Sequence, residues 1–535
     1  MKNSMYIWML GISMSLFSCS DIMDEKHDNP DAFTETKIEY LFARGAQRTV
    51  EMDYADAYNL TFRLIGNYIQ TTARQEGKDR INIYQKIQDD KGRWENYYVE
   101  RMSTLTEMDK IYSTLTAEEQ EGYKNYIEAG KVLKAYNTAM ATDFFGNMPY
   151  SEAFTARNSI YGGTVIFKPK YDSQKDIYYT LLADLKSAAE YFKTAESDDT
   201  FKRQDVIYKG DCEGWFRFAN SLRLRYAMRI SNVDPEKAKE VLSELNVEDL
   251  IIDNADNAYL KVSGQETAPD AIWRAMTESH NISNGYYMYA PEMMVNLLKE
   301  AQDPRLPVFF QPGADDDGVC LFPDQEIIGY PASADEAIEL VNSADKNELH
   351  EKYGVYNTVT FRKNYYLPAG IAMTAAESYF CLAEAAQRNL IAGDAASYYN
   401  KGILLSVQQY YDFYKNSTAD GVDEELADRD VSDETLQAWL NTSTFHYDES
   451  KALEQIATQK WLHLNILQTY ENWSEYRRTD LPVLDDDREN GMLLNKENTP
   501  VRFLYPAKEA SMNTENYNAQ AEYNKIDVRL WWDIK

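Results

Sequence analysis

Residues 373–414 read MTAAESYFCLAEAAQRNLIAGDAASYYNKGILLSVQQYYDFY, and this stretch predicts two helices joined by a short turn. The first helix is expected from Met373 to Leu390 and the second from Asp394 to Tyr414, because apolar residues recur at helical spacing in both. Between them, Gly393 can end one helix and Asp394 can cap the next. The stretch therefore predicts a helical hairpin.

The hairpin has the small-and-aromatic spacing of a tetratricopeptide repeat. Small residues let the two helices approach closely, and a tyrosine fills the space between neighbouring repeats. The positions that follow this spacing are Ala383, Ala386, Ala395, Tyr399 and Gly402. We therefore expect an all-α fold with a scaffold of tetratricopeptide-like helical repeats.

Helical periodicity also recurs outside the hairpin, at 121–141, 176–192 and 215–226, and a final long helix is expected from about Lys451 to Tyr470. The intervening segments are rich in Pro, Gly, Asn and Asp and have no sustained period. The longest are 253–274, 304–331 and 481–517. Loops of this length are usually functional or pack as a cap, so we expect one body with a helical scaffold and a loop-rich cap.

The N-terminus predicts export. Met5 to Leu16 has the length of the apolar region of a secretory signal and is too short to span a bilayer. It ends in Leu16-Phe17-Ser18-Cys19, which resembles the lipobox of bacterial lipoproteins, and the acidic residues that follow resemble a surface-export signal of Bacteroidetes. We expect a signal peptide at 1–18, lipidation of Cys19 and a lipidated tether at 19–36. The alternative is an ordinary signal peptide with an incidental cysteine.

Composition narrows the class of ligand. The 535-residue chain has a formal net charge of −32, which repels nucleic acid and anionic surfaces and favours neutral ligands. Cys212 and Cys381 fall in helical patterns and are expected to act as small core residues, although one disulfide among Cys212, Cys320 and Cys381 stays open. With five histidines and no metal-binding spacing, a zinc site is not expected.

The aromatic content supplies candidate ligand contacts. Sugar rings have apolar faces that stack on aromatic side chains, and hydroxyl groups that need fixed polar partners. Two stretches combine both features: the opening of a helix after residues 89–93, and an Asn-rich turn that runs into tyrosines. Their residues are Trp94, Tyr97 and Tyr98 in the first, and Trp273, Asn284, Tyr286, Tyr287 and Tyr289 in or near the second. The alternative is that these aromatic side chains pack the cap onto the repeats.

Two acidic runs, Asp315-Asp316-Asp317 and Asp485-Asp486-Asp487, offer carboxylate oxygens of the kind that bind calcium. Neither has the alternating spacing of an EF-hand loop, so solvated acidic loops are the expected alternative and no cofactor is expected.

Six segments, in order along the chain, resemble the SusD/RagB family of nutrient-binding outer-membrane lipoproteins. They are 143–153 (DFFGNMPYSEA), 215–231, Asp303-Pro304-Arg305-Leu306, 376–386, 459–461 with 473–479, and the C-terminal positions Arg502, 504–506, Glu509, Asn513 and Asn516. Together they cover nearly the whole chain after the signal peptide. The shared residues are expected to have structural roles: Asp143 and Asn147 at a helix end and tight turn, and Glu475, Arg477 and Arg478 as buried pairing groups.

This resemblance implies a lipoprotein at the cell surface, anchored in the outer membrane, that captures glycans or, in some members, peptides. It implies a SusC-like TonB-dependent transporter as partner, with this protein as its hinged lid and without catalysis. It also implies a single domain at 37–535, with repeat helices mainly at 37–230 and 371–475 and the cap mainly at 231–370 and 476–535. A surface glycoside hydrolase and a scaffold that binds only proteins are the alternatives from other classes.

Overall fold

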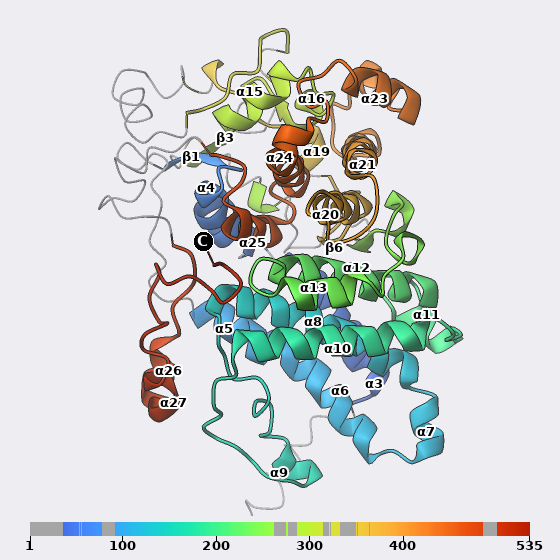
Figure 1. Cartoon of the computed structure of the whole chain (residues 1–535), viewed down its shortest axis with the longest axis vertical. Helices are drawn as coiled ribbons and strands as arrows, with labels where there is room; N and C mark the ends of the chain where they lie inside the picture. The colour runs from blue at the N-terminus through green and yellow to red at the C-terminus, as the bar shows by residue number, and fades with distance from the viewer. Residues whose placement is uncertain are drawn as a thin grey trace, which may run out of the picture.

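The structure is a computed structural model, and it describes residues 36–52, 54, 56–76, 91–261, 274–276, 286–313, 320, 323–331, 349, 351–362, 364–484 and 500–534. Two groups of long helices form the scaffold (Figure 1). The lower group in the view is α3 (Ile38–Val50), α6 (Met102–Thr114), α8 (Lys124–Phe145), α10 (Gln174–Phe192) and α12 (Cys212–Ile230). The upper group is α20 (Ala375–Gln387), α21 (Ala395–Lys415), α24 (Ala452–Leu464) and α25 (Thr469–Thr479).

Consecutive long helices pack side by side, as repeat hairpins do. The closest pairs are α20 with α21, α10 with α12, α8 with α10, α20 with α24, and α3 with α6. Helix α12 also contacts α20, which joins the two groups. This arrangement, with helices as the dominant element, confirms the expected all-α repeat scaffold.

Shorter helices connect the scaffold and build much of the rest. Their bounds are η1 (Asp56–Ile65) and η2 (Asn96–Arg101), both π-helical, α4 (Gly66–Tyr68), α5 (Lys91–Glu95), α7 (Ala117–Glu121), α9 (Asn158–Tyr161), α11 (Asp199–Gln204), α13 (Pro235–Leu242), η3 (Val247–Asp249), η4 (Asn254–Asp256), α15 (Glu292–Glu300), α16 (Leu306–Phe309), α19 (Thr358–Phe361), α22 (Glu424–Ala427), α23 (Asp433–Leu440), η6 (Glu449–Lys451), α26 (Ala507–Met512) and α27 (Thr514–Asn518).

In the part of the chain that the structure describes, six short strands lie outside the long helices: β1 (Ala73–Glu76), β2 (Ala258–Leu260), β3 (Tyr286–Tyr289), β4 (Phe310–Gln311), β5 (Val355–Tyr356) and β6 (Gly370–Met373). The first sheet has the order β1-β3-β5-β4, with antiparallel neighbours and Ala73 opposite Tyr289. The second pairs β2 with β6. The sequence analysis did not predict them, because strands of two to four residues are too short to show a period-two pattern.

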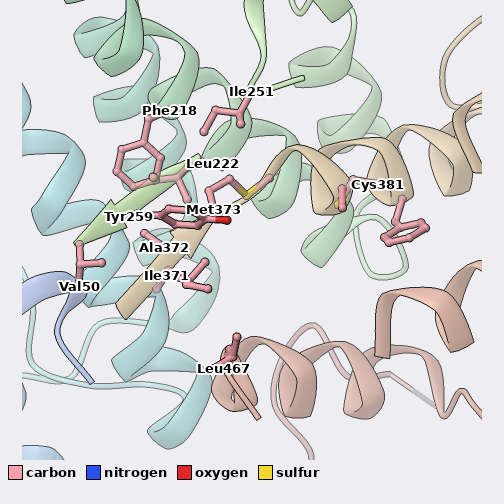
Figure 2. Packing of buried hydrophobic residues seen from close by; sticks show 14 of the residues in the cluster. Val50, Phe218, Leu222, Ile251, Tyr259, Ile371, Ala372, Met373, Cys381 and Leu467 are labelled. Carbon is pink, nitrogen blue, oxygen red and sulfur yellow. The ribbon is translucent and has the colours of Figure 1, made fainter. Parts of the chain in front are cut away.

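The second sheet packs directly on the repeat helices (Figure 2). Ile371, Ala372 and Met373 of β6 point into a buried cluster that includes Phe218 and Leu222 of α12. At the start of β6, a Cβ atom added to Gly370 would lie 1.7 Å from the carbonyl oxygen of Val50. Only glycine permits this approach of two backbones, so the sheet is held against the end of α3.

The predicted hairpin is present, but its first helix ends earlier than expected. Helix α20 stops at Gln387, where Asn389 adopts a positive φ of 55°. The amide of Leu390 donates to the carbonyl of Ala385 and that of Asn389 to Ala386, which is the hydrogen-bond pattern of a Schellman motif. Asp394 does cap α21, since its side chain accepts from the amide of Ala396.

The prediction of a single helix from Lys451 to Tyr470 is wrong, because the chain forms two helices here, α24 and α25. The break is at Asn465, which has a φ of 42°. The Oδ1 atom of Asn465 accepts a 2.6 Å hydrogen bond from Tyr356, and its carbonyl accepts one from Asn472. Tyr356 is distant in the sequence and Asn472 follows the break, so the local spacing of apolar residues could not reveal the break at Asn465.

Candidate functional site

Two tyrosines near the start of η1 present a pair of parallel rings. The ring centroids of Tyr54 and Tyr58 are 5.5 Å apart with an interplanar angle of 11°, and both side chains are half-buried. The guanidinium carbon of Arg63 lies 5.4 Å from the Tyr58 centroid, and that of Arg274 lies 4.7 Å from the Tyr54 centroid. We call these four residues the Tyr54–Tyr58 platform.

The platform lies against a segment that the sequence analysis selected. Arg274 directly follows Trp273 in the sequence, and through Arg274 the short described segment 274–276 meets the chain after α3 at these rings. Trp273 and Asn284 themselves lie outside the described residues. Flat rings with adjacent guanidinium donors provide both an apolar face and hydrogen-bonding groups, the combination that a sugar ring needs. Sequence analysis missed Tyr54 and Tyr58, although their spacing of four residues was a visible signal.

Tyr289 belongs to a buried aromatic cluster at the end of β3. Its ring stacks on Tyr330, with centroids 4.4 Å apart and an interplanar angle of 8°, and meets Tyr353 edge-on at 5.9 Å. All three side chains are buried, and burial raises the pKa of Tyr330. For Tyr286 and Tyr287 the backbone pairing with β1 is described. The cluster therefore stabilises the first sheet.

Trp94, Tyr97 and Tyr98 lie in a second aromatic cluster, away from β3, where α5 and η2 meet the C-terminal segment. Trp94 is 8% exposed and packs edge-on against Phe145 at 5.0 Å and Tyr505 at 5.8 Å. The hydroxyl of Tyr98 donates to the carbonyl of Pro149 at 2.6 Å, and that of Tyr97 lies 3.0 Å from the hydroxyl of Thr138.

These contacts correspond to the packing alternative, and burial raises the pKa of both Tyr97 and Tyr98. Tyr289, the residue of the second predicted group whose side chain the structure describes, lies in the separate cluster with Tyr330 and Tyr353. A ligand contact by any residue of the two predicted groups stays a prediction.

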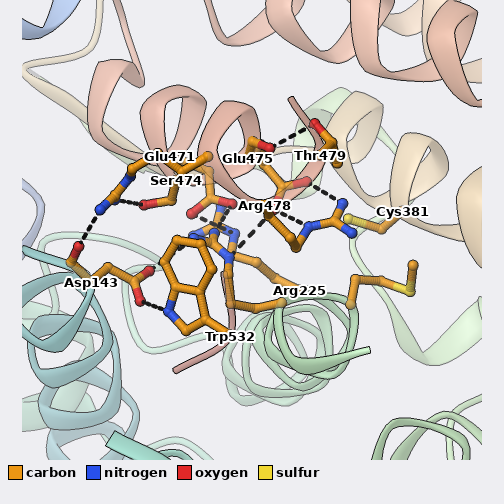
Figure 3. A network of polar contacts seen from close by, with 12 residues as sticks. Asp143, Arg225, Cys381, Glu471, Ser474, Glu475, Arg478, Thr479 and Trp532 are labelled. Atoms are coloured by element: carbon orange, nitrogen blue, oxygen red, sulfur yellow. Dashed lines mark hydrogen bonds and ion pairs between the residues drawn. The ribbon is translucent and has the colours of Figure 1, made fainter. Parts of the chain in front are cut away.

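Beneath the scaffold surface, a network of buried charges joins α8, α12, α20, α24 and α25 (Figure 3). Arg229 is fully buried and pairs with Asp143 at 2.8 Å, with Glu475 at 3.4 Å and with Glu471. Arg225 pairs with Glu377 at 2.6 Å. Because every charge has a partner, the network links the helices without leaving an unpaired buried ion.

Arg478 completes this network, with ion pairs of 2.6 Å to Glu384 and 2.7 Å to Glu475. Lys460 pairs with Glu475 at 2.9 Å. Burial alone raises the pKa of the Glu475 carboxyl, but Arg478, Lys460 and Arg229 outweigh burial and hold that pKa well below its ordinary value. The expectation of buried pairing groups is confirmed for Glu475 and Arg478, which join scaffold helices to each other.

The segment 143–149, which resembles a family segment, holds the C-terminal end of the described chain. Phe503 donates its amide to the carbonyl of Phe144, and their rings stack with centroids 4.9 Å apart. Arg477 donates to the carbonyl oxygens of Asp143 at 2.7 Å and Val501 at 2.9 Å, and Trp532 donates to the Asp143 carboxylate at 2.8 Å. This confirms a structural role for Asp143 and Arg477.

The two predicted calcium runs, Asp315-Asp316-Asp317 and Asp485-Asp486-Asp487, lie outside the described residues, as does Cys19. Within the described ranges, no group of three or more His, Cys, Asp or Glu side chains is placed to hold a metal ion. In the same part of the chain, no helix has the length and apolar character needed to cross a membrane. Cys212 and Cys381 are buried free thiols, as core residues would be.

Comparison with known proteins identifies close relatives in structure. The SusD-like family described as "Starch-binding associating with outer membrane" matches residues 30–506. A SusD homologue from Bacteroides fragilis superposes with a TM-score of 0.72 at 21% identity, covering 93% of this chain and 100% of the homologue.

Two further structures are named for a ligand. A chitin-binding protein superposes with a TM-score of 0.70 at 23% identity and covers 93% of this chain and 100% of its own. A chitin-binding SusD homologue from Flavobacterium johnsoniae has a TM-score of 0.66 at 21% identity, with 93% and 99% coverage. No curated protein sequence matches. Because the family match spans most of the chain and the fold agrees along its length, this chain belongs to the SusD-like family associated with the outer membrane.

Proposed function

We propose that this protein is a lipid-anchored protein of the cell surface that captures a glycan without chemical conversion. In this proposal it acts as a lid that delivers the glycan to a SusC-like TonB-dependent transporter. Membership of the outer-membrane SusD-like family supports the location and the nutrient-binding role. The lipobox-like sequence before Cys19 supports the anchor.

The observation that carries the proposed binding role is the Tyr54–Tyr58 platform. Parallel half-buried rings, with guanidinium groups 4.7 and 5.4 Å from their centroids, match the apolar face and hydroxyl edge of a sugar. The platform includes Arg274, which in the sequence directly follows Trp273 and precedes Asn284, Tyr286 and Tyr287 by 10 to 13 residues. We therefore place the glycan against the cap at this platform, with those residues as further candidates.

A glycan is favoured over a peptide because two structures with the same fold are named as chitin-binding. A peptide ligand stays the alternative within the family. For the hydrolase alternative, the described residues give no specific support, since among 87 acidic residues some pair will always satisfy a distance criterion.

The binding site is tested with the mature chain and a panel of neutral oligosaccharides and oligopeptides. Tyr58→Ala and Tyr54→Ala should weaken glycan binding about tenfold or more, because each removes a stacking face. The matched control is Tyr40→Ala, since Tyr40 is 53% exposed on α3 and outside the platform. Unchanged affinity in both platform variants would remove the platform from the site, and new reducing ends would defeat the non-catalytic role.

The anchor and the partner are tested separately in cells. Cys19→Ala should abolish incorporation of labelled fatty acid and retention at the surface, because the thiol is the proposed acylation site. Glycan affinity of the purified soluble body should not change. Co-purification of a TonB-dependent transporter with the wild-type protein is expected; its absence under mild solubilisation would favour a scaffold role.

A further inference from the structure

A cavity lies between α24 and α25 in the upper helix group, next to the end of α20. Its volume is about 170 Å³. A cavity of about 150 Å³ holds a single six-membered ring such as benzene, so this one has room for one ring. The wall of the cavity is apolar and is made of Leu453, Ile456, Ala457, Trp461, Tyr476 and Leu481. We call it the Tyr476 pocket.

The polar side of the Tyr476 pocket carries three cations and two carboxylates, and both carboxylates are paired. Glu384 pairs with Arg478 at 2.6 Å and with Arg388 at 2.9 Å, and Lys460 pairs with Glu475 at 2.9 Å. Burial raises the pKa of Glu384, but Arg478 and Arg388 outweigh burial and lower it, so the carboxylate stays ionised and accepts hydrogen bonds. No charge at the pocket is left without a partner, and the net charge of −32 for the whole chain disfavours an acidic ligand, so a neutral ligand is favoured.

Two polar groups in this pocket retain hydrogen-bonding capacity. The side-chain nitrogen of Asn472 donates to the carbonyls of Trp461 at 3.1 Å and Asn465 at 3.4 Å, whereas its Oδ1 atom accepts no hydrogen bond from the described part of the chain. Asn472 as a whole is 2% exposed and lines the pocket, and its Oδ1 atom is not one of the buried atoms left without a partner, so this acceptor is accessible from the cavity. Lys460 uses two of its three N–H groups, toward Glu475 and Cys381.

A ligand for this pocket must therefore be neutral, the size of one ring, apolar on one face and able to donate and accept hydrogen bonds at its edge. An aliphatic chain would leave Asn472 Oδ1 buried without a partner, which is unfavourable. A pyranose satisfies each condition, because every hydroxyl group both donates and accepts. We propose that the Tyr476 pocket binds one pyranose residue of a neutral glycan, as a second site in addition to the Tyr54–Tyr58 platform.

The proposal is tested on the full mature chain with free glucose, galactose, mannose and N-acetylglucosamine, each at about 20 mM, because a single ring binds with a Kd of about millimolar strength. Saturation-transfer NMR reports binding of each sugar. Ala457→Leu fills the pocket from a half-buried wall position, and Leu453→Trp covers its mouth from a position that is 43% exposed. Neither residue takes part in the ion pairs.

At least one monosaccharide should bind the wild type, and both variants should weaken that binding about tenfold or more. The control Ala521→Leu makes the same change at an exposed position away from the pocket and should bind normally. Tyr58→Ala should also retain this signal, which separates the pocket from the platform. The proposal is overturned if no monosaccharide binds, or if binding survives in Ala457→Leu and Leu453→Trp and is lost in Tyr58→Ala.

Discussion

Individual residues show how burial separates a packing aromatic from a candidate ligand contact. Trp94 and Tyr58 both come from aromatic-rich segments at the start of helices, and their sequence surroundings do not distinguish them. In the structure Trp94 is 8% exposed and enclosed by other rings, whereas Tyr58 is half-buried beside a parallel tyrosine. A ring that is enclosed on all sides stabilises the fold, whereas a half-buried ring keeps part of its surface available for another contact.

Trp94→Ala should therefore be strongly destabilising, by about 3–5 kcal/mol, because it leaves a cavity between Phe145 and Tyr505. Chemical denaturation followed by circular dichroism measures this loss. Tyr58→Ala is the comparison and should cost much less, since its side chain is already half-solvated. A melting temperature of Trp94→Ala equal to that of the wild type would show that the Trp94 cluster does not hold the C-terminal segment.

At the scale of elements, the long helices are joined by paired buried charges as well as by apolar packing. Arg478 on α25 reaches Glu384 on α20, and Lys460 on α24 reaches Glu475 on α25. The pKa values of Glu384, Glu471 and Glu475 are lowered in the folded state, because nearby cations outweigh burial. Asp143 differs: burial outweighs Arg229 and raises its pKa.

These shifts predict how stability depends on pH. A carboxyl with a lowered folded-state pKa releases its proton on folding, so its stabilisation is present above the unfolded pKa of about 4.3 and is lost as pH falls through the lower folded value. As the pH drops below about 5, the free energy of unfolding of the wild-type protein should decrease. Asp143 acts in the opposite sense and makes this decrease less steep.

Glu384→Gln removes one of these carboxylates. It should destabilise the protein at pH 7 by about 3–5 kcal/mol, because Arg478 loses a buried partner, and should flatten the slope between about pH 5 and 3. Urea denaturation at several pH values measures both effects. The control is Glu240→Gln, in an exposed pair with Lys237, which should change neither. An unchanged slope in Glu384→Gln would exclude Glu384 from the pH dependence.

At the scale of the whole molecule, the C-terminal segment is tied to an early scaffold helix. Residues of the segment 500–534 reach the end of α8, where Phe503 stacks on Phe144 and Trp532 donates to Asp143. Arg502 likewise donates to the carbonyl of Phe145. The end of α8 is thus packed against a segment that lies more than 350 residues later in the chain.

Truncation before Val501 should therefore prevent stable folding or lower the melting temperature sharply, because it exposes Phe144 and removes partners of Asp143 and Arg477. Thermal unfolding of the purified protein measures the effect. Removal of Ile534 and Lys535 alone is the control and should be nearly neutral, since Ile534 is 55% exposed. A truncated chain that melts like the wild type would show that the C-terminal segment is dispensable.

The amino-acid sequence by itself determined the class of fold, because the period of the apolar residues in 373–414 and in the other long segments is local and sufficient to place helices. It also determined structural roles for Asp143, Glu475, Arg477 and Arg478, through their resemblance to the family. It could not place the break at Asn465, the strands of the cap or the Tyr54–Tyr58 platform.

Only the tertiary structure decided those features. The break depends on the hydroxyl of Tyr356, the pairing of β1 with β3 joins distant segments, and Arg274 reaches Tyr54 across more than two hundred residues of chain. Burial likewise separated Trp94 from Tyr58, although both are aromatic residues near the start of a helix. Local propensity selects helices, whereas the accessible faces and the paired charges arise only when remote segments pack together.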